Sequence, residues 1–480
     1  MYYSIAGEAH DVNLSDQRLL DLGIRPKFRR EMSLFGVLGI SFCAIGILNG
    51  MSSAIQTGLF SGGPLGLFWG WNICSFFMLL IAFSFAEICS AYPTMGGLYF
   101  WVCKMKPDLN ESVFTGWLYS MAMVFTGVSA NLSVALYLSS MAEVGQGRTL
   151  TRSRNRCDRM GRHMSTLFVW WTLGGTVVLV TTLLVKAPMK NSADFVFTNV
   201  QNFTGWQSRG FVVLLGFLQA VYTLEGCETA AQVAEEAVRA EILAPLAVVG
   251  SIAGSWLIGL AYLLALLFAV QDIASVQATT FAIPIAQLFY DAVGPQLTQL
   301  CLIVIMVSQV MAAITTFTAS SRLFYALARD NAFPLKKQFL TLNRFQAPYW
   351  GVWTSVLIGC IISCAYIGSA IAFNAILSSA AISVMLSYLQ PIIIRVFWPD
   401  SIQDFGPFRL GKWSWPVNFA SFLFTIFVCI LFILPTAYPA DVLNMNYSIV
   451  AVGGLLVVIT INWFWWGRHS FKGLVKTVTI

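Results

Sequence analysis

Charged residues are scarce in this chain. Asp, Glu, Lys and Arg together make up 10% of the 480 residues, whereas hydrophobic residues make up 57%. Soluble domains carry roughly 25% charged residues. The composition therefore excludes an ordinary soluble protein and predicts an all-α polytopic membrane protein.

Histidines and the common catalytic motifs are also scarce or missing. The three histidines (His10, His163 and His469) lie outside the apolar runs, and no two of the ten cysteines have CxxC spacing. The sequence contains no phosphate-binding loop, no HExxH and no serine-hydrolase elbow. These absences argue against a haem or di-metal membrane enzyme, an ATPase or a protease. We expect no enzymatic activity, cofactor, metal or nucleic-acid partner.

Apolar segments follow a polar lead at residues 1–32, which lacks the apolar run of a cleavable signal peptide. At about 20 apolar residues per crossing, the sequence predicts a transmembrane domain over 33–466 and a basic tail over 467–480. The predicted spans are eleven: 33–56, 65–89, 113–141, 167–186, 209–234, 245–270, 296–319, 349–369, 371–397, 416–436 and 446–466.

The distribution of basic residues predicts that both tails are cytosolic. Lys and Arg accumulate in cytosolic loops of membrane proteins. The lead ends in a basic cluster (Arg25, Lys27, Arg29 and Arg30), and the most basic loop of the second half, around Arg322–Arg344, is cytosolic only if the C-terminus is too. Both ends inside require an even number of crossings, which eleven spans do not provide.

An arginine-rich segment marks the place of the conflict. Residues 142–165 contain six arginines, and at roughly 3 kcal/mol each their insertion would cost on the order of 18 kcal/mol. This segment therefore does not span, although the charges on both flanks require a crossing here. We interpret it as replacing a lost span through splicing, frameshift or gene-model error. The alternative is a true basic insertion in an eleven-span protein with an inverted second half.

The segment 208–236 carries acids in the middle of a predicted span. After an apolar run it contains Thr223, Glu225, Gly226 and Glu228. A mid-membrane carboxylate costs roughly 2.5–3.5 kcal/mol on insertion scales, and the glycine between the acids favours a break in the helix. A broken span with acids at the midplane suits the binding of a cationic group. The alternative is that either acid caps a half-helix or pairs with a polar neighbour.

The first predicted span has a related pattern. Gly46 and Gly50 flank Asn49. A glycine pair four residues apart permits close helix packing, and the same residues fit an unwound stretch whose amides and carbonyls face a substrate. Spacing alone favours helix packing over the unwound stretch.

Six stretches in order resemble the amino acid–polyamine–organocation (APC) superfamily, and most closely its fungal branch of GABA and choline permeases. They are LLDLGIRPKFRREMSLFGVLGISF (19–42), SGGPLGLFWGW (61–71), FAEICSAYPTMGGLYFW (85–101), FVFTNVQNFTGW (195–206), YTLEGCETAAQVAEE (222–236) and ASSRLFYALARDNAFP (319–334). The resemblance covers 19–141 and 166–466. It implies a LeuT-like transporter fold of two inverted five-helix repeats plus two peripheral helices, with the fourth of twelve crossings missing here.

The resemblance also implies a function. It predicts a secondary transporter for an amino acid, GABA or a choline-like solute, working by alternating access and coupled to H⁺, in the plasma membrane or alternatively the vacuolar membrane. We expect Glu228, with Glu225, to lie near the amine, and Phe42 or Tyr222 to add cation–π attraction of about 0.5–2 kcal/mol. The alternative is a transport-inactive splice form or degenerate paralogue. The candidate substrate-binding residues are Gly46, Asn49, Gly50, Tyr222, Thr223, Glu225, Gly226 and Glu228.

Overall fold

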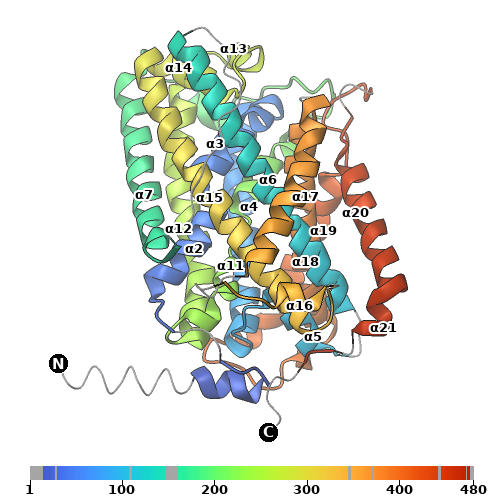
Figure 1. Ribbon diagram of the computed structural model, residues 1–480. Helices are drawn as coiled ribbons and strands as arrows, with labels where there is room; N and C mark the ends of the chain where they lie inside the picture. The colour runs from blue at the N-terminus through green and yellow to red at the C-terminus, as the bar shows by residue number, and fades with distance from the viewer. Residues whose placement is uncertain are drawn as a thin grey trace, which may run out of the picture.

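The computed structural model describes residues 15–26, 30–107, 111–146, 161–333, 335–343, 348–368, 371–441, 445–471 and 473–475. Its described part is a bundle of long helices (Figure 1). The helices of the first half are α2 (Leu34–Ile45), α3 (Ile47–Phe60), α4 (Gly63–Ala91), α5 (Gly97–Met105), α6 (Glu111–Gln146), α7 (Gly161–Lys186) and α8 (Ala193–Thr198). Those that follow are α9 (Arg209–Leu215), α10 (Phe217–Leu224), α11 (Thr229–Gln232), α12 (Ala240–Ala269), α13 (Ile273–Gln277), α14 (Ile285–Val293), α15 (Pro295–Arg329), α16 (Lys336–Phe339), α17 (Tyr349–Gly368), α18 (Ile371–Phe397), α19 (Ser414–Leu431), α20 (Ser448–Asn462) and α21 (Arg468–Ser470).

The predicted spans coincide with these helices. Ten helical segments of the described chain are long and apolar enough to cross a membrane, and a shorter apolar stretch, Tyr349–Cys364, lies in α17. Each of the eleven predicted spans overlaps one of them. The protein is thus an all-helical, multi-pass integral membrane protein.

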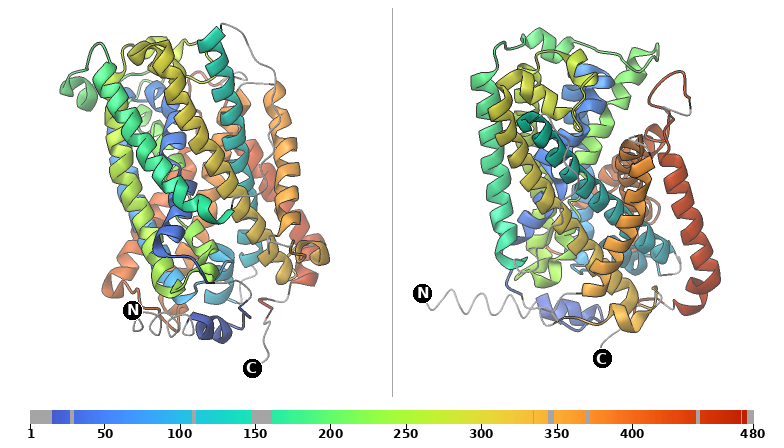
Figure 2. Two further views of the ribbon diagram at one scale, coloured as in Figure 1. Left: turned by 60° about the vertical axis from the view of Figure 1, so that its left-hand side comes forward. Right: turned by 45° about the horizontal axis from the view of Figure 1, so that its top comes forward.

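Two of the spans are interrupted near their middle. The first is divided at Gly46 into α2 and α3, and the fifth is divided at 225–228 into α10 and α11. Around them α6 packs along α15 and α18, and α4 packs along α12. The two interrupted spans therefore lie inside a frame of continuous helices (Figure 2).

One face of the bundle carries the described parts nearest both chain ends. Arg30 donates to Asp16 Oδ1 at 2.6 Å and to the Ala237 carbonyl at 2.9 Å. The Met32 amide donates to the Glu236 carbonyl at 3.0 Å, and the Val475 amide donates to Asp330 Oδ1 at 3.1 Å. We call this the N-terminal face. Helices α8, α13 and α14 lie on the opposite face (Figures 1 and 2).

Helices α6 and α7 are consecutive but run in the same direction. Along α6, Gly116 lies against Leu327 and Gly127 against Phe317, so α6 is antiparallel to α15. Along α7, Phe168 packs with Met311 and Gly175 lies against Val304, so α7 is antiparallel to α15 as well. The end of α6 and the start of α7 therefore lie toward opposite faces.

The predicted arginine-rich segment 142–165 is shorter than expected at both ends. Helix α6 continues to Gln146, and α7 begins at Gly161. Residues 147–160, with most of the arginines, lie outside the described residues.

A buried ion pair fastens α4 to α18 and α19. The side chain of Glu87, near the end of α4, is 1% exposed, and its Oε2 lies 3.0 Å from Arg395 Nη2. Ser414 Oγ donates to Oε2 at 2.6 Å and the Leu410 amide donates to Oε1 at 3.0 Å. This carboxylate is a structural anchor.

We expect Arg395→Met to lower the thermal unfolding temperature of the purified, detergent-solubilised protein strongly. Removing one member of a buried ion pair leaves an unpaired charge and costs about 3–5 kcal/mol. The double variant Glu87→Gln/Arg395→Met should recover part of the loss, and Lys412→Met on the surface should change little. Equal unfolding temperatures for Arg395→Met and Lys412→Met would contradict the anchor role.

Candidate functional site

The two helix interruptions lie directly against each other. Gly46 has φ +59° and Gly226 has φ +115°, values that favour glycine. A Cβ on Gly226 would lie 3.0 Å from the carbonyl carbon of Ala44 and 3.1 Å from the amide nitrogen of Ile45. The break of the fifth span therefore touches the end of α2. Both features considered for Gly46–Gly50 occur in the structure: the helix breaks at Gly46, and Gly50 packs closely against Thr223.

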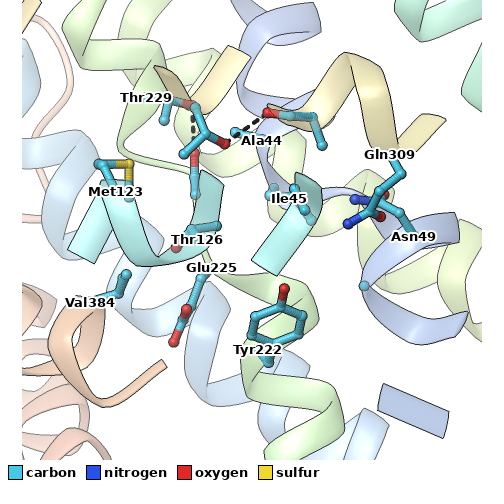
Figure 3. A pocket seen from close by; sticks show the side chains of 15 residues that line it. Ala44, Ile45, Asn49, Met123, Thr126, Tyr222, Glu225, Thr229, Gln309 and Val384 are labelled. Carbon is cyan, nitrogen blue, oxygen red and sulfur yellow. Dashed lines mark hydrogen bonds between the residues drawn. The ribbon is translucent and has the colours of Figure 1, made fainter. Parts of the chain in front are cut away.

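A small cavity lies beside this contact (Figure 3). Its volume is about 30 Å³, which is space for one or two water molecules, whereas drug-sized ligands occupy pockets of roughly 300–1,000 Å³. The cavity is therefore closed around little more than water. Its lining comes from both interrupted spans, α6, α15 and α18: Ala44, Ile45, Asn49, Gly50, Met123, Thr126, Ala130, Tyr222, Glu225, Gly226, Thr229, Gln309, Ala312, Thr316 and Val384.

Five of the eight predicted site residues line the cavity: Asn49, Gly50, Tyr222, Glu225 and Gly226. Two others support it. Gly46 forms the left-handed turn between α2 and α3, and Thr223 packs against Gly50, with its hydroxyl donating to the Gln219 carbonyl at 2.7 Å. The eighth, Glu228, is not among the lining residues.

Glu225 is the acid of the cavity. It follows the last residue of α10, where the backbone leaves the helix. The side chain is buried, and its Oε1 has no hydrogen-bond partner among the described residues. No Lys, Arg or His occurs among the lining residues that the structure describes. A buried intramembrane carboxylate without a cationic partner is a candidate site for a positively charged group.

Two amides and one aromatic ring complete the polar lining. The side-chain oxygens of Asn49 and Gln309 are buried and, within the described part of the chain, lack a hydrogen-bond partner. The ring of Tyr222 faces the same cavity, and its hydroxyl is 2.8 Å from Ser129 Oγ. Phe42, the other predicted cation–π candidate, is not a lining residue and lies near Gly254.

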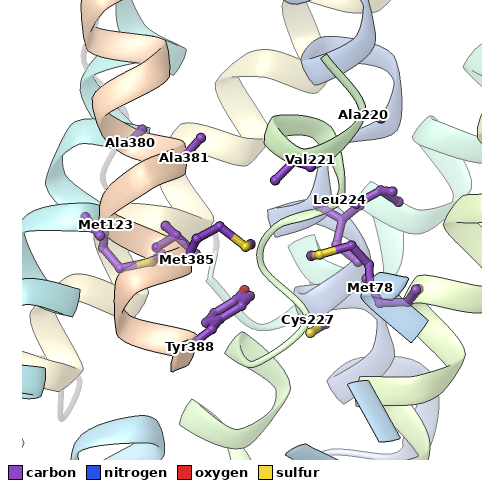
Figure 4. Close-up of a cluster of buried hydrophobic side chains, with 14 of the residues drawn as sticks. Met78, Met123, Ala220, Val221, Leu224, Cys227, Ala380, Ala381, Met385 and Tyr388 are labelled. Carbon is purple, nitrogen blue, oxygen red and sulfur yellow. The ribbon is translucent and has the colours of Figure 1, made fainter. Parts of the chain in front are cut away.

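Glu228 instead ties three helices together. Tyr119 of α6 and Tyr388 of α18 each donate a hydrogen bond to its carboxylate. The Tyr388 hydroxyl also accepts the Gly226 amide at 3.0 Å, and the Tyr119 hydroxyl accepts Gln232 Nε2 at 2.8 Å. Figure 4 shows Tyr388 directed from α18 toward the stretch at Cys227. Of the two uses considered for this acid, pairing with polar neighbours describes its contacts.

Sequence reasoning missed several residues of the candidate site. Gln309 is a polar residue inside the apolar run 296–319, a signal of the kind that identified Asn49. The threonines Thr126, Thr229 and Thr316 gave no signal, because threonine is common in membrane helices. Tyr119 and Tyr388 are far from Glu228 in sequence, and only the fold brings their hydroxyls to it.

Known proteins match nearly the whole chain. A family model described as amino acid permease matches residues 159–456. The amino-acid permease BAT1 of Arabidopsis thaliana is 31% identical over 496 aligned positions, which cover 96% of this chain and 96% of the relative. The GABA-specific permease of Saccharomyces cerevisiae is 26% identical, with 98% and 88% covered. The choline transporter of the same yeast is 26% identical, with 94% and 84% covered.

Interrupted membrane helices that meet at a cavity occur in membrane transporters. The sequence matches show that the chain is a membrane permease and not an enzyme. This chain belongs to the amino acid permease family of the APC superfamily.

The two acids should respond differently to neutralisation. We expect Glu228→Gln to lower the thermal unfolding temperature of the purified protein, because a tyrosine hydroxyl then loses a carboxylate acceptor, at a cost of about 1–3 kcal/mol. Glu225→Gln should leave the unfolding temperature unchanged or raise it, since Oε1 has no partner to lose. Tyr388→Phe should resemble Glu228→Gln. Equal destabilisation by Glu225→Gln and Glu228→Gln would contradict this assignment.

Proposed function

We propose that the protein is a secondary transporter that moves a small amine-bearing solute through the cavity at the two helix breaks by alternating access. The candidate solutes are an amino acid, GABA or a choline-like cation. One observation carries the proposal: Glu225 is buried at the cavity wall with an unpartnered oxygen, among described lining residues that include no cation. In this proposal Glu225 is the counter-ion of the amine and Tyr222 adds cation–π attraction.

The other end of an amino acid would lie near Gly46–Gly50. Helix α3 begins at Ile47, directly after the break. A helix N-terminus carries unpaired amides and a partial positive charge of roughly +0.5. Its position at the cavity favours a carboxylate on that side and the amine on the Glu225 side.

Alternating access requires that the closed cavity opens toward one face of the bundle at a time. At the N-terminal face, the Met32 and Val238 backbones pair, and Arg322 lies 2.7 Å from Glu236. These contacts hold the segment that follows α11. We infer that rocking of the two interrupted spans against the surrounding helices breaks these contacts and connects the cavity with this face, which the distribution of basic residues predicts to be cytosolic.

We infer that H⁺ is the coupling ion. Two buried carboxylates, Glu225 and Glu228, lie three residues apart on the interrupted span, and intramembrane acids of this kind relay protons in transporters. The Glu225 position is open to the cavity and so to solvent from either side when a face opens.

We expect Glu225→Gln to reduce uptake of the transported amine at least about tenfold, because removing one partner of a buried hydrogen-bonded charge pair costs roughly 2–5 kcal/mol. Cells expressing the protein would be tested with radiolabelled amino acids, GABA and choline. Asp194→Asn, a change of an exposed acid in α8, is the matched control. Normal uptake by Glu225→Gln at equal surface expression would rule out Glu225 as the counter-ion.

A second candidate is a transport-inactive form that lacks one crossing. Helices α6 and α7 run in the same direction although they are consecutive. The alignment with the Arabidopsis relative has 496 positions but takes in 96% of 480 residues, about 461, so gaps summed over the whole alignment leave about 35 positions of the relative without a counterpart here. A crossing needs about 20 residues.

The helix contacts support the same interpretation. Helix α18 packs on α6 and α10, and α7 packs on α15 and α2, as expected for the fifth helices of two inverted repeats. Helix α17 packs on α15, α6 and α18. We infer that its counterpart in the first repeat is the missing fourth crossing, and that comparison of the transcript with the genomic exons would find its origin.

Glycosylation mapping tests whether the second half keeps the orientation of the family. We expect an acceptor site inserted into 187–208 to be glycosylated and one inserted into 399–413 to remain unmodified, measured as a glycosidase-sensitive mobility shift. The two loops lie on opposite faces (Figure 2). The reverse pattern would mean an inverted second half, in which the repeats cannot pair and transport is lost.

A further inference from the structure

We propose that the cavity selects amines that carry N–H donors and discriminates against quaternary ammonium groups. This inference rests on the proposed function and narrows its substrate class: primary amines such as amino acids or GABA are taken, and choline or betaine is not. It follows from the hydrogen-bond state of every hydroxyl in the described lining.

The three threonines of the lining have already donated their hydroxyl protons. Thr126 donates to the Ala122 carbonyl at 3.0 Å, Thr316 to the Ala312 carbonyl at 2.8 Å and Thr229 to the Gly226 carbonyl at 2.6 Å. A hydroxyl has one proton and two lone pairs. Each threonine oxygen therefore offers only an acceptor to a solute.

The tyrosine hydroxyl is in the same state. Ser129 donates its proton to the Thr126 carbonyl at 2.8 Å. The contact of 2.8 Å between Ser129 Oγ and the Tyr222 hydroxyl therefore uses the tyrosine proton. Tyr222, like the threonines, has acceptor lone pairs left and no proton to give.

The remaining polar lining adds further acceptors. Glu225 Oε1, Asn49 Oδ1 and Gln309 Oε1 are buried without a hydrogen-bond partner among the described residues. The Gly226 amide donates to Tyr388 and is not available. The amide nitrogens of Asn49 and Gln309 are thus the side-chain donors that the described lining retains.

A lining rich in acceptors separates the two kinds of amine. A primary ammonium brings three N–H donors, whereas a trimethylammonium group brings none and would bury the acceptors unpaired, at about 1–3 kcal/mol each. Quaternary groups are typically held by cages of several aromatic rings. Tyr222 is the single aromatic residue of the described lining.

The experiment uses the purified full-length chain and two ligand series in which successive N-methylation removes donors. One series runs from glycine to betaine, and the other from 4-aminobutyrate to its N,N,N-trimethyl derivative, with choline added. Affinity is measured as ligand-dependent thermal stabilisation, a readout that does not require transport. We expect affinity to fall at least about tenfold between the primary and the trimethyl member, corresponding to one lost charged hydrogen bond.

A matched pair of variants on α15 tests the cause. Thr316→Val removes a cavity acceptor, whereas Thr318→Val removes an identical hydroxyl that donates to its own helix but is exposed on the outside of the bundle. Thr316→Val should weaken the primary amine about 2- to 10-fold and leave the trimethyl ligand unchanged, and Thr318→Val should change neither.

The outcomes separate the two proposals. If no member of either series stabilises the protein, this inference is overturned, and the proposed function is decided by the uptake panel of amino acids, GABA and choline. If trimethyl ligands or choline bind as tightly as the primary amines, the proposed function stands and the donor requirement is overturned. Equal effects of Thr316→Val and Thr318→Val would also overturn it.

Discussion

The close contact between two helix breaks is the constraint on which the rest of this structure depends. Gly226 lies against the backbone of Ala44 and Ile45, and Gly50 lies against Thr223 at the next level. Each helix is interrupted where the other approaches, so polar backbone groups freed by the breaks face one another and not lipid. In a membrane, irregular backbone is tolerated only in such protein-lined places. Each interrupted span therefore depends on the other to shield the polar backbone groups at its break from lipid.

The contact between the two breaks gives different surroundings to two acids that are three residues apart. Glu225 leaves the helix at the cavity side and keeps an oxygen without a partner among the described residues. Glu228 is the N-cap residue of α11 and accepts hydrogen bonds from the hydroxyls of Tyr119 and Tyr388. Tyr388 also holds the Gly226 amide. The geometry of the break therefore depends on Glu228. The carboxylate that faces the cavity at this break is that of Glu225.

The sequence predicted the helices and the neighbourhood of the site, but not the roles within it. Long apolar runs determine the spans almost alone, and scarce polar residues such as Asn49 and Glu225 are conspicuous inside them. The sequence did not predict which acid lines the cavity and which is hydrogen-bonded, because that depends on tyrosines more than one hundred residues away. The same holds for Glu87, whose partner Arg395 comes from another helix. Within a membrane span, sequence reveals which residues need a partner, and tertiary contacts decide which of them receive one.

The proposed loss of a crossing has different consequences for solute binding and for transport. The described cavity lining comes from α2, α3, α6, α10, α11, α15 and α18 and the break at 225–228. Helix α7 packs on α2 and α15 from outside the cavity. If the fourth crossing is lost as proposed, the described cavity still forms from the elements that remain. The proposed loss would then affect the frame against which the interrupted spans move, so we expect solute binding to survive it and transport to depend on it.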